Sequence, residues 1–369
     1  MRVLIAPDGF AGTLGSSAAA AAIAEGWART APADVLELAP LSDGGPGLVE
    51  VLAAALPGAQ LHEVAVEDPL ARTVPAAFLL HGTTAYVESA QASGLHLLAE
   101  DERDPTVTTT YGVGQLVRAA LDAGARRVVV GLGGSGTNDG GAGLLAALGV
   151  QGVDGAGERL APGGLALRHL TALHGWGRID AELVVATDVD APLLGLHGAS
   201  SVYGPQKGAT REQVMALDVA LERWAEVLEA HCGRAVRDLP GAGAAGGLGA
   251  ALLALGAVRE PGIALVERLV GLEQRIAQAD LVLTGEGTLD ATSLTGKVVS
   301  GVAGLAAAHA VPCVVLAGQV RVGRREAASH GIEAEHAVAD LVGLEAALAD
   351  PAGSLALLAQ RVAAQWSRA

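Results

Sequence analysis

The strongest constraint on the fold is an alternation of short apolar segments with Ala- and Leu-rich segments at both ends of the chain. Residues 2–6 read RVLIA, residues 16–30 read SSAAAAAIAEGWART, and residues 34–38 read DVLEL. Strand, loop, helix and strand in this order indicate βαβ units, which build a parallel sheet. The same pattern returns after residue 279, in ADLVLTGEG and VPCVVLAGQV.

The middle of the chain has a different rhythm, because three short strands follow one another without helices between them. They are LHEVAVEDPL from residue 61, VPAAFLLHG from residue 74 and TAYVES from residue 84. This spacing predicts an antiparallel or mixed sheet. We therefore predict an α/β protein of two domains with a cleft between them. The first is a discontinuous parallel-sheet domain (residues 1–62 and 262–369), and the second is an inserted mixed-sheet domain (residues 63–261).

Composition and charge argue against several function classes. The net charge of −16 disfavours general nucleic-acid binding, which requires a basic surface. No apolar run approaches the ~18 residues that span a bilayer, and MRVLIAPDGF lacks the long apolar region of a signal peptide. We expect a cytoplasmic protein without membrane partners, and a homo-oligomer is left open. Cys232 and Cys313 fit no zinc or redox spacing, so we expect reduced thiols.

Five loops combine acidic residues with glycine or directly follow a predicted strand. Their acidic and amide side chains are Asp8, Asp43, Asn138 with Asp139, Asp188 with Asp190, and Glu286 with Asp290. Asp and Asn before Gly are common in ordinary turns, so any single loop also has a structural explanation. Five such loops favour a functional site, because the loops after parallel strands meet at one edge of a sheet.

The pair Asp188 and Asp190, in ATDVDAPL, suits Mg²⁺, which takes one or two carboxylates together with waters and phosphate oxygens. A solvated turn at the strand end is the competing interpretation. The chain also has only two lysines, Lys207 in GPQKG and Lys297 in LTGK, against 22 arginines. A lysine ammonium is a compact charge that can follow a transferring phosphoryl group. Chance placement of both lysines in loops is the alternative.

The stretch RRVVVGLGGSGTNDGGAGLLAALG, residues 126–149, contains Gly131, Gly133 and Gly136 in the dinucleotide-binding spacing. The spacing is weak support by itself, since the chain has 51 glycines and repeats it at residues 241–246. A Rossmann site also needs a ribose-binding acid about 20 residues further on. The nearest candidate, Asp154, lies in a predicted turn. The polar run SGTND therefore favours a phosphate cradle over a dinucleotide site.

Taken in order, the motifs of this chain resemble the bacterial glycerate kinase family, which phosphorylates D-glycerate with ATP. The segments are APDGF with SDGG, TTTYGVGQL, GLGGSGTNDGGAG, DVDAPL, GPQKGAT, PGAGAAGGLGA, and TGEGTLD with LTGKVVSGVA. The resemblance covers nearly the whole chain. It implies a two-domain α/β protein in which the discontinuous domain is flavodoxin-like and the active site lies between the domains.

The chain departs from the family pattern on loops that the resemblance assigns to the small substrate. Where the family commonly has PDSFKGSL, ADGGEGT, DVDNPL and LHGK, this chain has Ala11, Pro46 with Leu48, Ala191, and Thr295. The segments GGSGTNDGG and GPQKG are nearly intact. The motifs thus support phosphoryl transfer more directly than they identify the acceptor.

We expect an ATP- and Mg²⁺-dependent kinase for a small hydroxy acid, with D-glycerate giving 2-phosphoglycerate. The rival hypotheses are an NAD-dependent oxidoreductase, favoured by the glycine spacing, and a catalytically silent ligand-binding paralogue, favoured by Ala11, Pro46 and Ala191. The expected roles are metal ligation by Asp188 and Asp190; phosphate binding by Gly133, Gly134, Ser135, Gly136, Thr137, Asn138, Asp139 and Lys207; catalysis by Asp43, Asp290, Asp8 and Lys297; and substrate binding by Asp8, Asp43, Glu286 and Lys297.

Overall fold

The computed structural model describes residues 1–10, 12–176 and 179–367. The described chain folds into two compact units. Unit 1 contains Met1–Asp43, Glu50–Pro57 and the chain from Gly262 onward, and unit 2 contains Gly44–Val49 and Gly58–Pro261. The boundary predicted after residue 62 falls inside the strand β3 (Gln60–Glu67).

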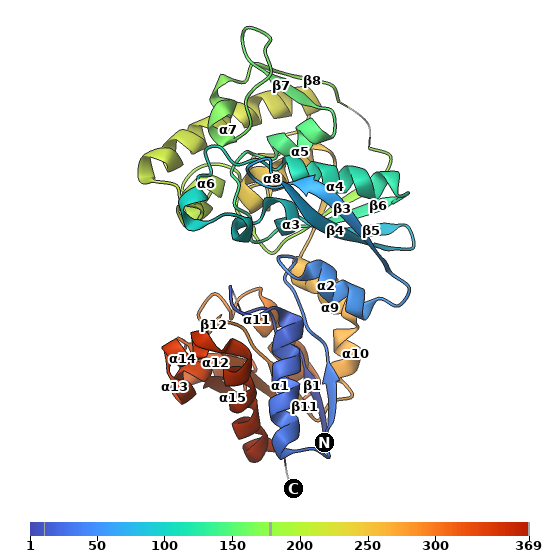
Figure 1. Cartoon of the computed structure of the whole chain (residues 1–369), viewed down its shortest axis with the longest axis vertical. Coiled ribbons are helices and arrows are strands. Elements are labelled where there is room, and N and C mark those ends of the chain that lie inside the picture. The colour runs from blue at the N-terminus through green and yellow to red at the C-terminus, as the bar shows by residue number, and fades with distance from the viewer. Residues whose placement is uncertain (11, 177–178, 368–369) are drawn as a thin grey trace. The chain divides into compact units, whose positions relative to one another are not determined.

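Unit 1 is built on a five-stranded parallel sheet (Figure 1), as the βαβ rhythm at the two ends of the chain predicts. Its strands, from one edge to the other, are β15 (Ala334–Ala337), β13 (Cys313–Ala317), β11 (Leu281–Thr284), β1 (Arg2–Ile5) and β2 (Val35–Leu38). Every residue of β11 and β13 is buried. Continuous burial of this kind is typical of parallel strands that are covered on both faces.

The helices of unit 1 lie between and after its strands in the sequence. They are α1 (Ser16–Thr30), α2 (Leu48–Ala55), α9 (Gly262–Val270), α10 (Leu272–Ile276), α11 (Val298–Ala308), α12 (Arg324–Ser329), α13 (Val338–Val342), α14 (Leu344–Ala349) and α15 (Pro351–Trp366). A short parallel pair, β12 (Thr288–Leu289) with β14 (Gln319–Val320), lies outside the main sheet.

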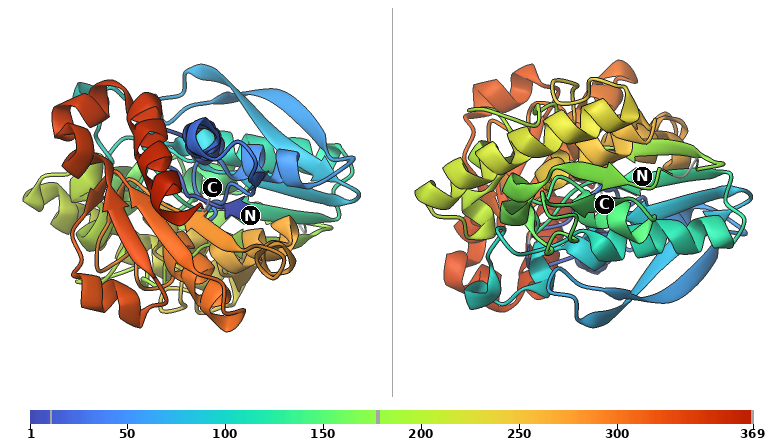
Figure 2. Two further views of the ribbon diagram at one scale, coloured as in Figure 1. Left: turned by 90° about the horizontal axis from the view of Figure 1, so that it is seen from below. Right: turned by 90° about the horizontal axis from the view of Figure 1, so that it is seen from above.

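The helices α1 and α15 lie side by side (Figure 1; Figure 2, left) and share one hydrophobic core. They approach closely at Gly26, where an added Cβ would overlap the carbonyl oxygen of Ala356. Next to it Trp27 is fully buried, and its Nε1 donates a hydrogen bond of 2.9 Å to Asp34. A hydrogen atom in place of a side chain therefore allows the first and last helices of the chain to pack together.

Unit 2 is built on a six-stranded mixed sheet, which confirms the mixed sheet predicted for the middle of the chain. The strand order is β10 (Val258–Glu260), β9 (Glu182–Ala186), β6 (Arg127–Gly131), β5 (Thr84–Glu88), β4 (Thr73–His81) and β3. The first four strands are parallel, whereas β4 is antiparallel to both β3 and β5. The antiparallel part is the segment in which the sequence has no helices between its strands.

The remaining elements of unit 2 are mostly short. They are α3 (Ala90–Ser93), α4 (Tyr111–Asp122), α5 (Ala142–Ala147), α6 (Ala199–Tyr203), α7 (Arg211–Cys232), α8 (Ala244–Ala254), a hairpin of β7 (Gln151–Val153) and β8 (Ala172–His174), and four 3₁₀ turns, η1 (Leu95–Leu97), η2 (Glu100–Glu102), η3 (Gly164–His169) and η4 (Pro205–Lys207). Thr210 caps α7 by accepting a hydrogen bond from the backbone of Gln213. None of the helices among the described residues is long and apolar enough to cross a membrane.

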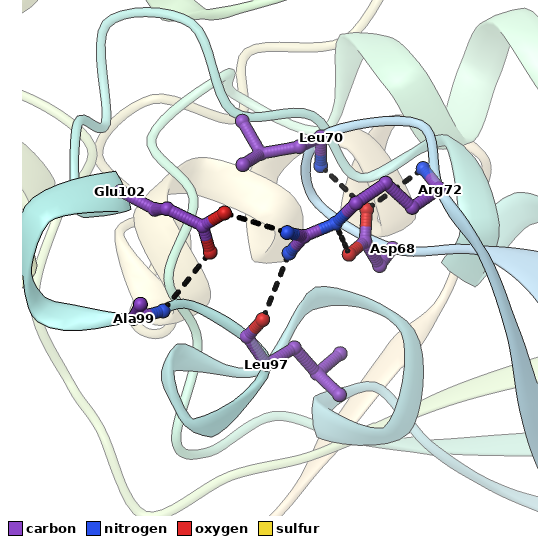
Figure 3. A network of polar contacts seen from close by, with 6 residues as sticks. All are labelled: Asp68, Leu70, Arg72, Leu97, Ala99 and Glu102. Atoms are coloured by element: carbon purple, nitrogen blue, oxygen red, sulfur yellow. Dashed lines mark hydrogen bonds and ion pairs between the residues drawn. The ribbon is translucent and has the colours of Figure 1, made fainter.

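A polar network centred on Arg72 holds the two 3₁₀ turns η1 and η2 against the end of β3 (Figure 3). Asp68, which is 1% exposed, accepts hydrogen bonds from the backbone of Leu70 and Arg72 and from Arg72 Nε. The other guanidinium nitrogens of Arg72 reach Glu102 at 2.7 Å and the carbonyl of Leu97 at 3.0 Å. Because every nitrogen of this guanidinium has a partner, the loop that leads to α4 has a defined path.

We predict that Gly26→Ala lowers the free energy of unfolding by about 1–3 kcal/mol, because a methyl group would force α1 away from α15. Gly304→Ala is the matched control, since that helical glycine has nothing within 4 Å of its added Cβ. The control should be neutral or stabilising by about 0.5–1 kcal/mol. Urea denaturation of the three proteins tests the pair, and equal stability of Gly26→Ala and the parent would contradict close packing at this point.

Candidate active site

The first cluster of candidate residues follows three adjacent parallel strands of unit 1. Asp8 comes after β1, Asp43 after β2 and Glu286 after β11, and these strands are neighbours in the order β11, β1, β2. Parallel strands end at the same edge of a sheet, so the three carboxylates are carried to one place. The structure thus brings together acids that are separated by most of the chain.

These residues line one cavity of about 450 Å³ within unit 1, together with Asp290 and Lys297. All five candidate residues that the sequence analysis named in unit 1 therefore share a single cavity. Its remaining polar lining includes Thr13, Thr288 and Gln319. A cavity with several convergent polar groups is the usual form of a small-molecule site.

Burial and like charges perturb this cluster. Burial, together with the negative charges of Asp43 and Glu286, raises the pKa of Asp8 to about 8, although a 2.7 Å hydrogen bond from the backbone of Gly9 opposes this shift. Burial likewise raises the pKa of Glu286. Its Oε1 is buried and accepts no hydrogen bond from the described residues. A carboxyl group that titrates near neutral pH is suited to accept a proton from a substrate hydroxyl.

Asp290 has the opposite environment. The hydroxyl of Thr292, at 2.7 Å, holds the pKa of Asp290 below its usual range, and the backbone N–H of Thr292 donates a second hydrogen bond. Lys297 Nζ donates to the same Thr292 hydroxyl at 3.1 Å. One carboxyl group therefore stays ionised while its neighbour Asp8 titrates near pH 8, which separates their chemical roles.

The second cluster is the glycine-rich loop of unit 2, between β6 and α5. Its centre is Asp139, which is 1% exposed and accepts hydrogen bonds from the backbone of Thr110, Gly141 and Gly143 and from the Thr110 hydroxyl. Burial raises the pKa of Asp139, whereas these donors favour its charged form. The amides at the start of α5 are thus used by an internal carboxylate.

Lys207 supports this loop from inside the protein. Only 1% of the residue is exposed, and its Nζ donates to Ser135 Oγ at 2.9 Å and to the Thr137 carbonyl at 2.7 Å. Burial lowers the pKa of Lys207 to about 7, although the charge of Asp139 opposes this effect. Asn138 is fully buried as well and donates to Ser200 Oγ at 2.9 Å. In the loop between β6 and Asp139, only the stretch around Gly133 and Gly134 reaches solvent.

The residues proposed as metal ligands follow β9 in unit 2. Asp190 is exposed, and its carboxylate makes a 2.6 Å ion pair with Arg259 of β10. Asp188 is half-buried. Within the described parts of the chain, no three His, Cys, Asp or Glu side chains are arranged to hold a metal ion.

The structure places four of the five residues that depart from the family pattern. Pro46 packs on the glycine-rich loop, since an added Cβ on Gly134 would lie 2.7 Å from its Cγ. Leu48 is fully buried, the Ala191 carbonyl accepts a hydrogen bond from Gly243, and Thr295 is exposed. Ala11 lies outside the described residues.

Sequence reasoning missed one part of the cavity in unit 1. Its apolar lining comes from α13, α14 and α15, and consists of Val338, Leu344, Ala347, Leu348, Pro351 and Leu355. These helices have no glycine or acidic motif, and leucine in an amphipathic helix is ordinarily a core residue. Only a search for unusually exposed leucines could have indicated them, and exposure is a property of the fold.

The chain is similar to known proteins over nearly its whole length. The model of the glycerate kinase family matches residues 3–367. The chain is 43% identical to a glycerate kinase of Halalkalibacterium halodurans, covering 90% of this chain and 89% of that one, and 41% identical to glycerate 2-kinase of Escherichia coli, covering 93% and 92%.

A crystal structure of a glycerate kinase 2 candidate from Salmonella typhimurium superimposes with a TM-score of 0.80 at 40% identity, covering 99% of this chain and 98% of that one. Similarity of this extent in sequence and in fold leaves one assignment. The chain belongs to the glycerate kinase family and is an enzyme of the kinase class.

Proposed function

We propose that the protein transfers the γ-phosphoryl group of ATP to a hydroxyl of D-glycerate. The observation that carries this proposal is the cavity of unit 1, where Asp8 has a pKa near 8 beside other carboxylates and Lys297. Family membership supports a nucleotide co-substrate and a small-molecule acceptor. We propose 2-phosphoglycerate as the product, which the name of the Escherichia coli relative, glycerate 2-kinase, supports.

In this proposal Asp8 is the base. The acceptor hydroxyl loses its proton to the Asp8 carboxylate while its oxygen forms a bond to the γ-phosphorus of ATP. The bond from that phosphorus to the β–γ bridging oxygen breaks, and ADP leaves with the electron pair. From the sequence, Asp43, Asp290 and Asp8 are all candidates for catalysis. The raised pKa of Asp8 and the lowered pKa of Asp290 favour Asp8 for proton transfer.

Lys297 is proposed to neutralise charge on the transferring group or on the acceptor carboxylate. Lys297 lines the same cavity as Asp8, and its ammonium donates a hydrogen bond to the Thr292 hydroxyl. A compact cation suits a phosphoryl group whose charge moves between two oxygens. Asp43 and Glu286 then complete the substrate-binding surface of the cavity.

The glycine-rich loop is proposed to contact ATP phosphates through its solvent-accessible stretch around Gly133 and Gly134. The buried residues of the loop have a supporting part in this scheme: Asp139 and Lys207 fix its backbone from within, and Asn138 ties it to Ser200. Preorganised backbone donors lose little freedom when an anion binds.

Mg²⁺ is proposed as the cation that accompanies ATP, and two carboxylate sets could bind it. Asp188 and Asp190 are the set that the sequence suggests, but Asp190 already has an arginine partner. In unit 1 Glu286 and Asp43 line the same cavity, and the Oε1 of Glu286 accepts no hydrogen bond from the described residues; Mg²⁺ needs only one or two carboxylates beside waters and phosphate oxygens. When bound, the ion would neutralise phosphate charge and orient the nucleotide.

The proposed function is tested by incubating the protein with ATP and Mg²⁺ and a panel of hydroxy acids, with phosphorus NMR of the products. We expect D-glycerate to be the best acceptor and 2-phosphoglycerate to form. Absence of product with every acid would favour the silent paralogue, and calorimetric binding of NAD would favour the oxidoreductase. The Mg²⁺ dependence of Asp190→Asn and Glu286→Gln in the same assay separates the two carboxylate sets.

We predict that Asp8→Asn loses activity by about 100-fold or more and gains stability at alkaline pH. The folded-state pKa of Asp8 lies above its ordinary value. The stability contributed by its protonated form is therefore present at low pH and lost as the pH rises toward 8. The melting temperature of Asp8→Asn should match the parent near about pH 4 and exceed it increasingly up to about pH 9.

Asp290→Asn is the control with the opposite sign, because its folded-state pKa is lowered. Its loss of stability should be present at neutral pH and should disappear only as the pH falls below the ordinary pKa of an aspartate, through the lowered folded-state pKa. If Asp8→Asn changed the melting temperature equally at all pH values, the pKa of the Asp8 carboxyl group would not be raised in the folded state.

We predict different consequences for the two lysines. Lys297→Arg should fold normally and lower kcat/KM by about tenfold or more, because a guanidinium plane does not replace a compact charge. Lys207→Arg should instead lower the free energy of unfolding by about 1–3 kcal/mol, because Nζ is enclosed by the loop. Kinetics and denaturation of both variants check this, and parent-like kinetics of Lys297→Arg would remove it from the mechanism.

A further inference from the structure

Two leucines of α14 are exposed although they line the cavity of unit 1. Leu344 is 47% exposed and Leu348 is 57% exposed, and both belong to the lining that includes Asp8 and Lys297. They are four residues apart on one helix, so they share a helical face. Figure 1 shows α13, α14 and α15 grouped in unit 1, and adjoining residues of these helices also line the cavity.

A three-carbon acid has too little apolar surface to pack against these leucines. Glycerate consists of a carboxylate and hydroxyl groups with few apolar atoms, and contact with leucine would remove water from those groups without replacing its hydrogen bonds. The acidic and lysine side of the cavity is the part that fits such a molecule. The leucine side requires a ligand with a flat or apolar surface.

We infer that Leu344 and Leu348 form the binding surface for the heterocyclic base of the nucleotide. The inference rests on the proposed kinase function. It assigns the apolar side of the cavity to the base of the nucleotide, and the acidic and lysine side to the reacting groups. The base packs on α14, and the phosphates extend toward Lys297, whose charge suits them. Ligand sites commonly combine an apolar lining with a few polar groups that fix orientation.

The alternative occupant of the same surface is the acceptor, which would then be a larger acid with an apolar tail. The two cases differ in a measurable way. If the base packs on the leucines, their replacement weakens ATP and leaves the acceptor unaffected. If the acceptor packs there, replacement of the leucines weakens binding of the acceptor and leaves ATP binding unaffected.

The test uses the full chain with Leu344→Ser and Leu348→Ser, and with Leu357→Ser as the matched control. Leu357 is 44% exposed on α15 but does not line the cavity. All three substitutions replace an exposed leucine, so none is expected to disturb folding, and circular dichroism verifies this. The steady-state KM values for ATP and for D-glycerate are measured, and binding of ATP and of inorganic triphosphate is measured by calorimetry.

We expect each α14 variant to raise the KM and dissociation constant for ATP about tenfold, with less than about twofold change for D-glycerate. Binding of triphosphate, which lacks the base, should be unchanged, and the Leu357→Ser control should match the parent. Unchanged ATP binding in both variants overturns the inference. The apolar cavity of about 330 Å³ beside Tyr111 and Trp224 in unit 2 would then be the next candidate.

A rise in the KM for D-glycerate without a rise in the KM for ATP also overturns the inference. Failure of the proposed function is distinguishable, because calorimetry needs no acceptor. A parent that binds ATP but does not phosphorylate glycerate refutes the function, while loss of ATP affinity in the α14 variants still supports the base-binding surface.

Discussion

Parallel pairing of β11, β1 and β2 is the constraint on which the candidate site depends. These strands end at one edge of the sheet, so the loops that carry Glu286, Asp8 and Asp43 have no alternative but to approach one another. The cost of that approach is visible in the raised pKa of Asp8, where desolvation acts together with like charges. The rest of unit 1, including the close packing of α1 on α15, stabilises a fold that holds this unfavourable cluster in place.

In the glycine-rich loop of unit 2, by contrast, hydrogen-bond partners surround the buried charged groups. There the Asp139 carboxylate accepts hydrogen bonds from three backbone N–H groups and from the Thr110 hydroxyl, and the Lys207 ammonium donates to a hydroxyl and a carbonyl. Residues of the same types as those in unit 1 are thus used to fix a loop. A charged group with satisfied hydrogen bonds contributes rigidity, whereas one with unsatisfied atoms, such as Glu286, remains available to a ligand.

Much of the architecture follows from local patterns in the sequence. The βαβ rhythm predicts the parallel sheet of unit 1, and the closely spaced strands after residue 60 predict the mixed sheet of unit 2. The acid loops after β1, β2 and β11 could be assigned to one sheet edge for the same reason. The pairing of Asp190 with Arg259 could not be anticipated, because it joins the loop after β9 to β10, and these two strands are distant in sequence and become neighbours only in the folded sheet.

By itself, the sequence determined the α/β class, the family and the identity of the acids and lysines that could carry the chemistry, since these depend on residue type and on spacing within a strand or loop. Only the tertiary structure decided which of them face a cavity. Lys207 and Lys297 both stand beside glycine in the sequence, yet one is enclosed by hydrogen-bond acceptors and the other lines the site with Asp8. The direction of a side chain and the dielectric around it are set by packing against residues far away in the chain, and no local pattern encodes them.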